Sequence, residues 1–438
     1  MVRQKIVLYS TTITPRLNYI ATHILTGLLG ADLVFTGYRQ EAISAAVPVI
    51  SYSPEHISGA VNILPCGLLH TTGKDPLDVV PTMCDGIPVL FLNDGNYDTG
   101  FDVLAASFFM LSRYEEYLPF RRDSHGRFTY KVSMACKFQL SDLPLVDMWA
   151  CELQKAILNK YPRVLFPERK FSFIPTIDID VPWAYKNKGF GRTFAGFGVA
   201  LAKLQMQEFS NRYRVLFGKN TDPYDTYSDI YKIHDQAGLT PVFFFSPGTY
   251  GRYDKSAAAS NSGYRRLVRY IGDKYPAGVH PSYYSYNDRA IMSGEIQRFR
   301  EMSGIYPVKS RQHYLRLELP VTYRLLIDNG IREDYTMGWP DMPGFRAGTS
   351  TPFLFYDLEL EKTTALKVWP LHIMDGTLRD YLKLDKEQAF MHSDRIIKKV
   401  RRYGGTLVTL WHNESFSGKG RWKDWKNLYL DIIKSAVT

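Results

Sequence analysis

Strand patterns alternate with helix patterns from about residue 171 to the end of this 438-residue chain. Short apolar runs bounded by turn residues predict seven strands, at 171–179, 240–246, 277–281, 308–315, 332–337, 366–373 and 406–412. Helical periodicity predicts helices at 265–274, 289–302, 320–329, 386–402 and 423–436. Alternating strands and helices are typical of an α/β fold with a parallel sheet, and seven such units favour a barrel or a strongly curved sheet.

The first part of the chain follows a different pattern. Strands are predicted at 5–10 and 32–37, and helices at 15–30, 100–118 and 144–161. The stretch 161–170 contains prolines and charged residues, as linkers often do. A chain of this length favours two domains over one. We therefore predict a smaller N-terminal α/β domain over 1–165, without a catalytic cluster, and a catalytic domain over 166–438.

Two carboxylates, Asp178 and Asp180, end the first strand of the second part. Side chains two residues apart on a strand point the same way, and two such close charges need a metal or a cation beside them. Histidines and an arginine stand at three other predicted strand ends: His280, Arg311, His313 and His412. The carboxyl ends of parallel strands converge on one face of a barrel, so we expect all six side chains to share one site.

These residues resemble, in order, the motifs of the polysaccharide deacetylases, the NodB-homology or carbohydrate esterase family 4 group. The acidic stretch 176–180 is similar to the family's Thr-Phe-Asp-Asp motif, and 280–284 to its His-Ser/Thr-x-x-His motif. The stretch 303–313 resembles the arginine motif, and 410–412 the closing Leu-x-His. The resemblance covers roughly 170–436. It implies a distorted seven-stranded (β/α) barrel, preceded here by an accessory domain, and metal-dependent removal of an acyl group from an amino sugar.

The chain departs from this pattern at two positions. Tyr284 stands where the family has its second metal-binding histidine, and His313 stands where the third motif has proline. His313 follows Arg311 by two residues on the same predicted strand, so both should face the site. We therefore predict that Asp180, His280 and His313 hold one divalent metal. Two histidines and a carboxylate leave open positions on the metal, and Zn²⁺ is the first choice for such mixed ligands.

The resemblance also implies catalytic roles. Asp178, held by Arg311, is the predicted general base. His412 is the predicted general acid, because an amide leaves poorly as an anion and its nitrogen needs a proton. Asp341 and Asp375 are the two candidates for the acid that supports the His412 imidazolium.

Substrate contacts are predicted less directly. Tyr283 and Tyr284 are candidate stacking platforms, Arg346 is a candidate pocket residue, and a backbone N–H near Ser282 or Tyr283 is a candidate oxyanion donor by analogy with the family. The predicted function is hydrolysis of an N-acyl group, acetyl first, from an amino sugar in a glycan or glycan precursor. Two alternatives stay open: a catalytically degraded glycan-binding or assembly protein with the deacetylase fold, and a metal-dependent amidase with another substrate.

The formal net charge of +10 suits an anionic partner, yet no block of Lys and Arg interleaved with aromatic residues marks a nucleic-acid surface. The most basic stretch, 186–219, has seven basic residues and one acidic residue, with an amphipathic helix pattern over 194–204. It is either a solvated helix packed on its own domain or a peripheral contact with a membrane surface.

The beginning of the chain carries too short an apolar run for a secretory signal, and no uninterrupted apolar run is long enough to span a bilayer. We therefore expect a cytoplasmic protein. Such a protein would act on a precursor, namely a lipid-linked glycan, a nucleotide sugar or an oligosaccharide.

Overall fold

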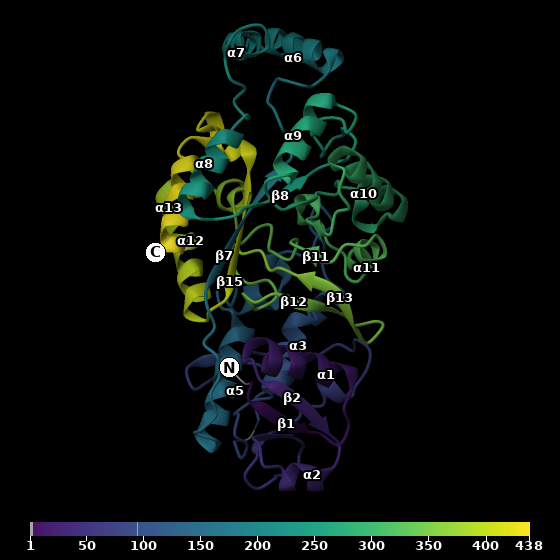
Figure 1. Ribbon diagram of the computed structural model, residues 1–438, viewed down its shortest axis with the longest axis vertical. Helices are drawn as coiled ribbons and strands as arrows, with labels where there is room; N and C mark the ends of the chain where they lie inside the picture. Colours follow the sequence, from purple (N-terminus) through teal and green to yellow (C-terminus); the bar gives the residue numbers. More distant parts are fainter. Residues whose placement is uncertain (1–2, 94) are drawn as a thin grey trace.

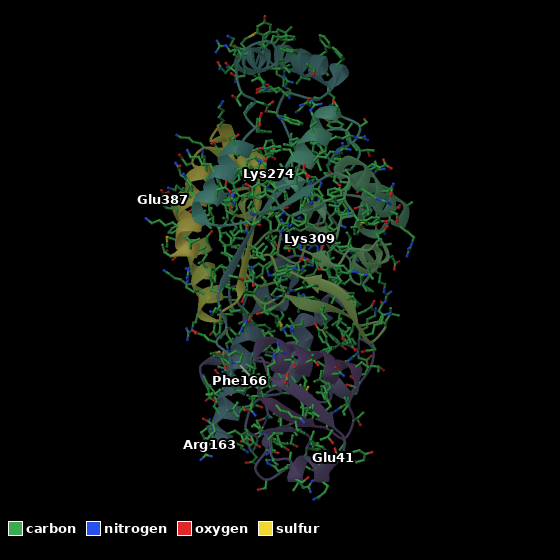
Figure 2. All side chains as sticks on the ribbon, in the orientation of Figure 1. Glu41, Arg163, Phe166, Lys274, Lys309 and Glu387 are labelled. Atoms are coloured by element: carbon green, nitrogen blue, oxygen red, sulfur yellow. The ribbon has the colours of Figure 1, made fainter. Side chains whose placement is uncertain are left out.

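The computed structural model describes residues 3–93 and 95–438 and has a mixed α/β fold (Figure 1). A small sheet lies at one end of the molecule, a large sheet forms the middle, and a pair of helices projects at the other end (Figure 1). Side chains fill the space between the elements (Figure 2). Among the described residues, no helix has both the length and the apolar content needed to cross a bilayer.

The N-terminal part is built on a four-stranded parallel sheet in the order β2-β1-β3-β4. Its strands are β1 (Lys5–Tyr9), β2 (Asp32–Thr36), β3 (Val49–Tyr52) and β4 (Val61–Ile63), and a separate hairpin pairs β5 (Thr82–Cys84) with β6 (Ile87–Val89). The helices are α1 (Pro15–Ala21), α2 (Arg39–Ser44), α3 (Val103–Leu111), α4 (Met134–Lys137) and α5 (Leu145–Lys160). The Thr14 side chain caps α1 and Pro15 opens it, the usual chemistry of a helix start.

The large sheet has nine strands in the order β12-β13-β11-β10-β9-β8-β7-β15-β14, and only the β12–β13 pair is antiparallel. The strands are β7 (Ser172–Ile179), β8 (Val242–Phe245), β9 (Ala277–Val279), β10 (Lys309–Ser310), β11 (Glu333–Asp334), β12 (Phe353–Asp357), β13 (Lys362–Val368), β14 (Ile373–Met374) and β15 (Thr406–His412). Strand β8 is buried on both faces, which explains its unbroken apolar sequence.

The strand order follows the chain from β7 to β11, β13 then lies next to β11 with β12 at the edge, and β15 and β14 lie on the other side of β7. The extended segment between β13 and β14 bridges the two sides. Trp369 donates its backbone N–H to Asp334 on β11, and three residues later His372 donates to Val408 on β15, both to carbonyl oxygens. The ladder nevertheless has two edges, β12 and β14, so the seven-stranded barrel predicted from the sequence is not confirmed.

Helices flank the large sheet, with α8, α12 and α13 on one side and α9, α10 and α11 on the other (Figure 1). Their bounds are α8 (Tyr227–Ala237), α9 (Ser262–Gly272), α10 (Arg289–Ser303), α11 (Val321–Asp328), α12 (Lys386–Arg402) and α13 (Trp425–Val437). The predicted helix at 194–204 is part of a two-helix hairpin, α6 (Phe190–Ala202) and α7 (Met206–Leu216).

The predicted strand 308–315 ends early. Only Lys309 and Ser310 pair in the sheet, and the chain then turns through a 3₁₀ segment in which Tyr314 and Leu315 have positive φ angles. His313 therefore does not share a strand with Arg311, as the sequence argument assumed. The turn, not strand alternation, directs this histidine into the site.

Candidate active site

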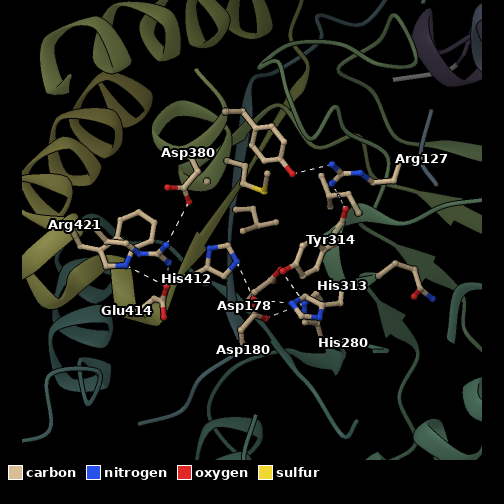
Figure 3. Close-up of a pocket in the computed structure, with 17 residues that line it drawn as sticks. Arg127, Asp178, Asp180, His280, His313, Tyr314, Asp380, His412, Glu414 and Arg421 are labelled. Atoms are coloured by element: carbon tan, nitrogen blue, oxygen red, sulfur yellow. Dashed lines mark hydrogen bonds and ion pairs between the residues drawn. The ribbon is translucent and has the colours of Figure 1, made fainter. Parts of the chain in front are cut away.

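A cavity of about 370 Å³ opens at the carboxyl ends of β7, β9, β10 and β15. Its lining includes both predicted carboxylates and all three predicted histidines (Figure 3). The strands end at one edge of the sheet because they run parallel, which is why residues far apart in sequence meet here. Arg311 lies beneath this cavity and is fully buried.

Asp180, His280 and His313 form a cluster that could hold a metal ion. One ligand atom from each residue lies within 4.8 Å of the others. The Asp180 carboxylate spans the two imidazoles: Oδ1 is 3.1 Å from His280 Nε2, and Oδ2 is 3.2 Å from His313 Nε2. The tyrosine that replaces the usual second histidine, Tyr284, is 53% exposed and does not line the cavity.

The chemistry of the donor atoms fits a cation. His280 Nδ1 lies 2.5 Å from the backbone oxygen of Arg311, which can only accept, so Nδ1 carries the proton and Nε2 presents a lone pair. That lone pair faces Asp180 Oδ1, and both atoms are buried without a hydrogen-bond partner among the described residues. On the other imidazole, His313 Nδ1 donates to Asp254 at 2.8 Å and so leaves Nε2 pointing at Asp180. Such support of the far ring nitrogen is typical of metal-binding histidines.

The electrostatics of the site, taken without a metal, also favour added positive charge. Burial lowers the pKa of His313, but Asp180 and Asp254 outweigh burial and raise it to about 10. Burial raises the pKa of Asp180, yet the charge of His313 and the contacts with the His313 and His412 imidazoles hold it well below its usual value. The carboxylates thus attract protons onto imidazoles, and a divalent cation would supply the same charge compensation.

Asp178 lies beside this cluster. Its Oδ1 accepts from Arg311 Nη1 at 2.9 Å, and its Oδ2 lies 3.8 Å from His280 Nε2. The arginine also donates to Thr176 Oγ1 and to the backbone oxygen of Tyr335, so its position is set from three sides. The predicted Asp178–Arg311 pair is therefore present in the structure.

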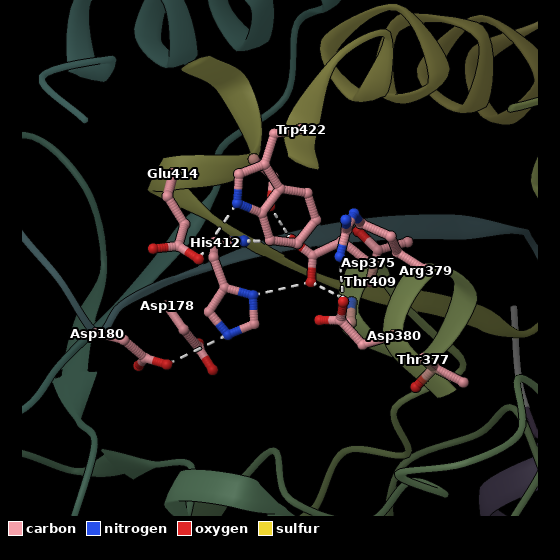
Figure 4. Close-up of polar contacts among 12 residues, drawn as sticks. Asp178, Asp180, Asp375, Thr377, Arg379, Asp380, Thr409, His412, Glu414 and Trp422 are labelled. Atoms are coloured by element: carbon pink, nitrogen blue, oxygen red, sulfur yellow. Dashed lines mark hydrogen bonds and ion pairs between the residues drawn. The ribbon is translucent and has the colours of Figure 1, made fainter. Parts of the chain in front are cut away.

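His412 approaches Asp180 from the other side. Its Nε2 is 3.4 Å from Asp180 Oδ2, and its Nδ1 donates to Asp375 Oδ1 at 2.8 Å (Figure 4). Asp375 Oδ2 accepts from the His412 backbone N–H and from the Ser415 hydroxyl, which fixes the carboxylate. Burial lowers the pKa of His412, but Asp375 and Asp180 raise it well above its usual value. Asp341, the other candidate partner, instead accepts from the backbone N–H of Tyr130.

Three predicted substrate contacts need correction. Tyr283 and Tyr284 do not line the cavity, and Tyr283 is buried in a stack with Tyr253 at 3.9 Å between ring centres. Arg346 does not line it either, because its guanidinium is buried in an ion pair with Glu116 at 2.6 Å.

The predicted oxyanion donors are also already occupied. Ser282 N donates to Glu295 at 2.7 Å, and Tyr283 N donates to Asp254 at 3.0 Å.

Several cavity residues were not predicted from the sequence. Tyr314 and Tyr381 supply the aromatic wall that we assigned to other tyrosines, and Trp422 adds an indole. Arg127 comes from the N-terminal part and donates to the Tyr314 carbonyl oxygen at 2.8 Å and to the Tyr381 hydroxyl at 2.9 Å. Asp254 lies in a long loop after β8 with no local pattern that could have revealed it.

Comparisons with known proteins identify a family only for the N-terminal part. Residues 6–162 match a family of unknown function, DUF7033. A search of curated proteins found no significant match.

Solved structures similar to this chain include a candidate polysaccharide deacetylase from Mycobacterium smegmatis, with 16% identity, a TM-score of 0.41, and coverage of 63% of this chain and 87% of that one. A family 4 carbohydrate esterase from Streptomyces lividans, in complex with acetate, has 11% identity, a TM-score of 0.30, and coverage of 61% and 88%. A carbohydrate esterase family 4 pseudoenzyme from Bacillus anthracis has 11% identity, a TM-score of 0.30, and coverage of 59% and 61%.

Proposed function

We propose that this protein is a metal-dependent hydrolase that removes an N-acyl group, most simply acetyl, from an amino sugar. One observation carries the proposal: the Asp180–His280–His313 cluster shares one cavity with Asp178 and His412 (Figure 3), and Arg311 and Asp375, which do not line the cavity, hold these two side chains from behind. A metal site with a base and an acid beside it could activate water, take its proton and protonate the departing nitrogen, which are the steps of amide hydrolysis. We also propose that residues 166–438 form an incomplete NodB-type barrel and that the chain divides into two domains near residue 165.

Asp180, His280 and His313 would hold the metal, and Zn²⁺ suits two imidazoles and one carboxylate. A metal there would act as a Lewis acid on the substrate carbonyl and on water. The ligand set leaves open coordination positions, unlike the closed four-ligand set of a structural zinc site.

The chain's own residues would move the protons. Asp178 would take a proton from the attacking water, and Arg311 fixes that carboxylate by donating to Oδ1, which leaves Oδ2 for the water. His412 would give a proton to the departing amine nitrogen from Nε2, since Nδ1 is held by Asp375. Asp178 and His412 are register partners on the adjacent strands β7 and β15, and both line the same cavity.

The rest of the cavity suits a sugar. Tyr314, Tyr381 and Trp422 offer ring faces, and Asp380 and Glu414 offer acceptors for hydroxyl groups. The partner we propose is an amino-sugar-containing glycan, or its lipid-linked or nucleotide-sugar precursor.

The alternative function, a noncatalytic glycan-binding or assembly protein, rests on the loss of histidine at position 284. In that case the site would not retain metal or turn over substrate.

Acetate release tests the proposed function. Purified protein would be incubated with N-acetylglucosamine oligosaccharides and with nucleotide-linked and lipid-linked N-acetylated sugars, and acetate would be measured by a coupled enzymatic assay. We expect release that stops after chelation and returns with Zn²⁺. The Asp178→Asn variant should release little or none, whereas Arg122→Ala, at an exposed arginine outside the cavity, should match the parent. No release from any N-acetylated amino sugar by metal-loaded protein would contradict the proposal.

A further inference from the structure

The α6–α7 hairpin projects from the body of the molecule, at the end opposite the N-terminal sheet (Figure 1). Aromatic packing holds its two helices together, with the Phe197 ring 4.9 Å from Phe209. Its base is fixed to the body, because Asp222 accepts backbone N–H groups from 184, 185 and 186. The hairpin is therefore an ordered projection on a fixed base.

Large apolar side chains on α6 point into solvent. Phe190, Phe194 and Leu201 recur at i, i+4 and i+11, which places them on one stripe of the helix. Their exposed fractions are 86%, 67% and 55%. Leu204, at the turn between the helices, is 80% exposed.

A matching stripe runs along α7. Met206, Tyr213 and Phe217 recur at i, i+7 and i+11 and are all more than half exposed, and at the turn Leu204 and Met206 also line the space between the hairpin and the body. Phe197 lies next to the α6 stripe and stacks on Phe217 at 6.5 Å between ring centres, so the two stripes adjoin. A contiguous apolar surface of this kind marks a binding face.

The charge of the hairpin indicates what covers this face. The segment 186–219 contains seven basic residues and only one acidic residue, Glu208. Lys203 and Arg214 are exposed close to the apolar stripes. A second copy of the chain would bring two strongly cationic hairpins together, which is unfavourable, whereas anionic lipid headgroups complement both the charge and the apolar stripes.

A second cavity, of about 1210 Å³, lies between the hairpin and the body. Lys188, Arg192, Arg212 and Lys255 line it, and Arg212 Nε is buried without a hydrogen-bond partner among the described residues. Glu414 lines both this cavity and the catalytic one. This space, lined by four basic residues and by the carboxylates Glu208 and Glu414, adjoins both the apolar hairpin and the catalytic cavity.

We infer that the α6–α7 hairpin docks on an anionic membrane surface, with its apolar stripes among the lipids and its basic residues at the headgroups. Resting on the proposed function, this placement favours a lipid-linked amino sugar as the substrate, presented to the catalytic cavity from the bilayer.

Vesicle flotation tests the inference with the full chain. Vesicles of phosphatidylcholine alone would be compared with vesicles that also contain phosphatidylglycerol. We expect binding to the anionic vesicles only, with loss at high salt. Vesicle binding needs no turnover, so its result is independent of whether the protein is a deacetylase.

Two sets of variants locate the contact. Phe190→Ser with Phe194→Ser should reduce binding at least tenfold, and Lys203→Glu with Arg214→Glu should do the same, because each basic residue at a bilayer surface contributes severalfold to affinity. The matched controls are Tyr38→Ser, an exposed aromatic residue on the N-terminal part, and Lys131→Glu, an exposed lysine outside the hairpin.

All of these positions are on the surface, so unchanged melting temperatures should show that the variants fold. Absence of binding to anionic vesicles would overturn the inference, as would equal binding by the hairpin variants. Dimers that dissociate in the Phe190→Ser and Phe194→Ser variant would also overturn it, by identifying a second copy as the occupant.

Discussion

The candidate site is centred on one residue, Asp180, whose carboxylate lies within 3.4 Å of three imidazoles, those of His280, His313 and His412. Each imidazole is held at its far nitrogen by a different group: a backbone carbonyl, Asp254 and Asp375 respectively. The charge of the partner does not by itself assign the roles, because His313, a proposed ligand, also has a carboxylate behind it. The neutral carbonyl leaves His280 as a pure ligand, whereas the carboxylate behind His412 suits a residue that must carry a proton.

The first prediction concerns the base. Asp178→Asn should keep the metal but lower the deacetylation rate by about 10²–10⁴, the usual contribution of a general base. The asparagine preserves the shape and can still accept from Arg311, so the melting temperature should change little. Loss of the metal in this variant would instead make Asp178 a ligand, a role that its 3.8 Å separation from His280 Nε2 keeps within reach.

The second prediction concerns the acid. His412→Ala should keep the metal but cleave an activated ester, whose leaving group needs no proton, far better than an amide. The ratio of the two rates in the variant and in the parent is the measurement. Equal losses on both substrates would assign His412 a positioning role. His392→Ala, on α12 and outside the cavity, is the matched control and should change neither rate.

At the scale of single elements, regular segments could be predicted from the sequence. Strand β15 and helix α12 begin and end at the predicted residues. The reason is local: α12 starts with a capping box between Asp385 and Gln388, and β15 is an apolar run in a parallel sheet.

Irregular segments could not be predicted in this way. The turn at 311–315 contains two positive φ angles on non-glycine residues, which no local pattern in the sequence announces. The carboxylates and histidines predicted at strand ends do come together, whereas Tyr283, Tyr284 and Arg346, predicted as substrate contacts, do not line the cavity. Asp254 and Arg127 reach the site from loops, where sequence periodicity carries no information.

The third prediction concerns the loop 121–130. Arg127 donates to the Tyr314 carbonyl oxygen and to the Tyr381 hydroxyl, so it positions the cavity wall. We assign it no proton transfer in the reaction. Arg127→Ala should raise KM about tenfold, in keeping with loss of hydrogen bonds to a charged group, and should change kcat and metal content much less. Arg122→Ala serves again as the control. A large fall in kcat with unchanged KM would place Arg127 in the chemistry itself.

At the scale of the whole molecule, the N-terminal part and the large sheet share one continuous core. A buried network crosses between them, in which Glu116 pairs with Arg113 at 2.8 Å and with Arg346 at 2.6 Å. All groups proposed to bind metal or move protons lie after residue 168, but the cavity wall is completed by Arg127 from the N-terminal part. That residues 166–438 alone carry the catalytic chemistry therefore stays a prediction. We expect the two parts to unfold together, because they share a core and a buried ionic network.

The fourth prediction follows from this network. Glu116→Ala leaves two buried arginines without their shared carboxylate and should lower the free energy of unfolding by about 3–5 kcal/mol. Urea denaturation followed by tryptophan fluorescence would measure it. Glu152→Ala, which removes only an exposed pair with Lys155, should cost less than about 1 kcal/mol. Similar stability of the two variants would show that the network does not couple the two parts.

The metal content of the His313→Ala variant tests the central claim most directly, because this residue is the proposed substitute for the missing histidine at position 284. Elemental analysis of purified protein should find one divalent metal per chain in the parent and in the His392→Ala control. We predict that His313→Ala and His280→Ala both lose this metal. Retention of one metal per chain by His313→Ala, with loss in His280→Ala, would contradict the proposed ligand set.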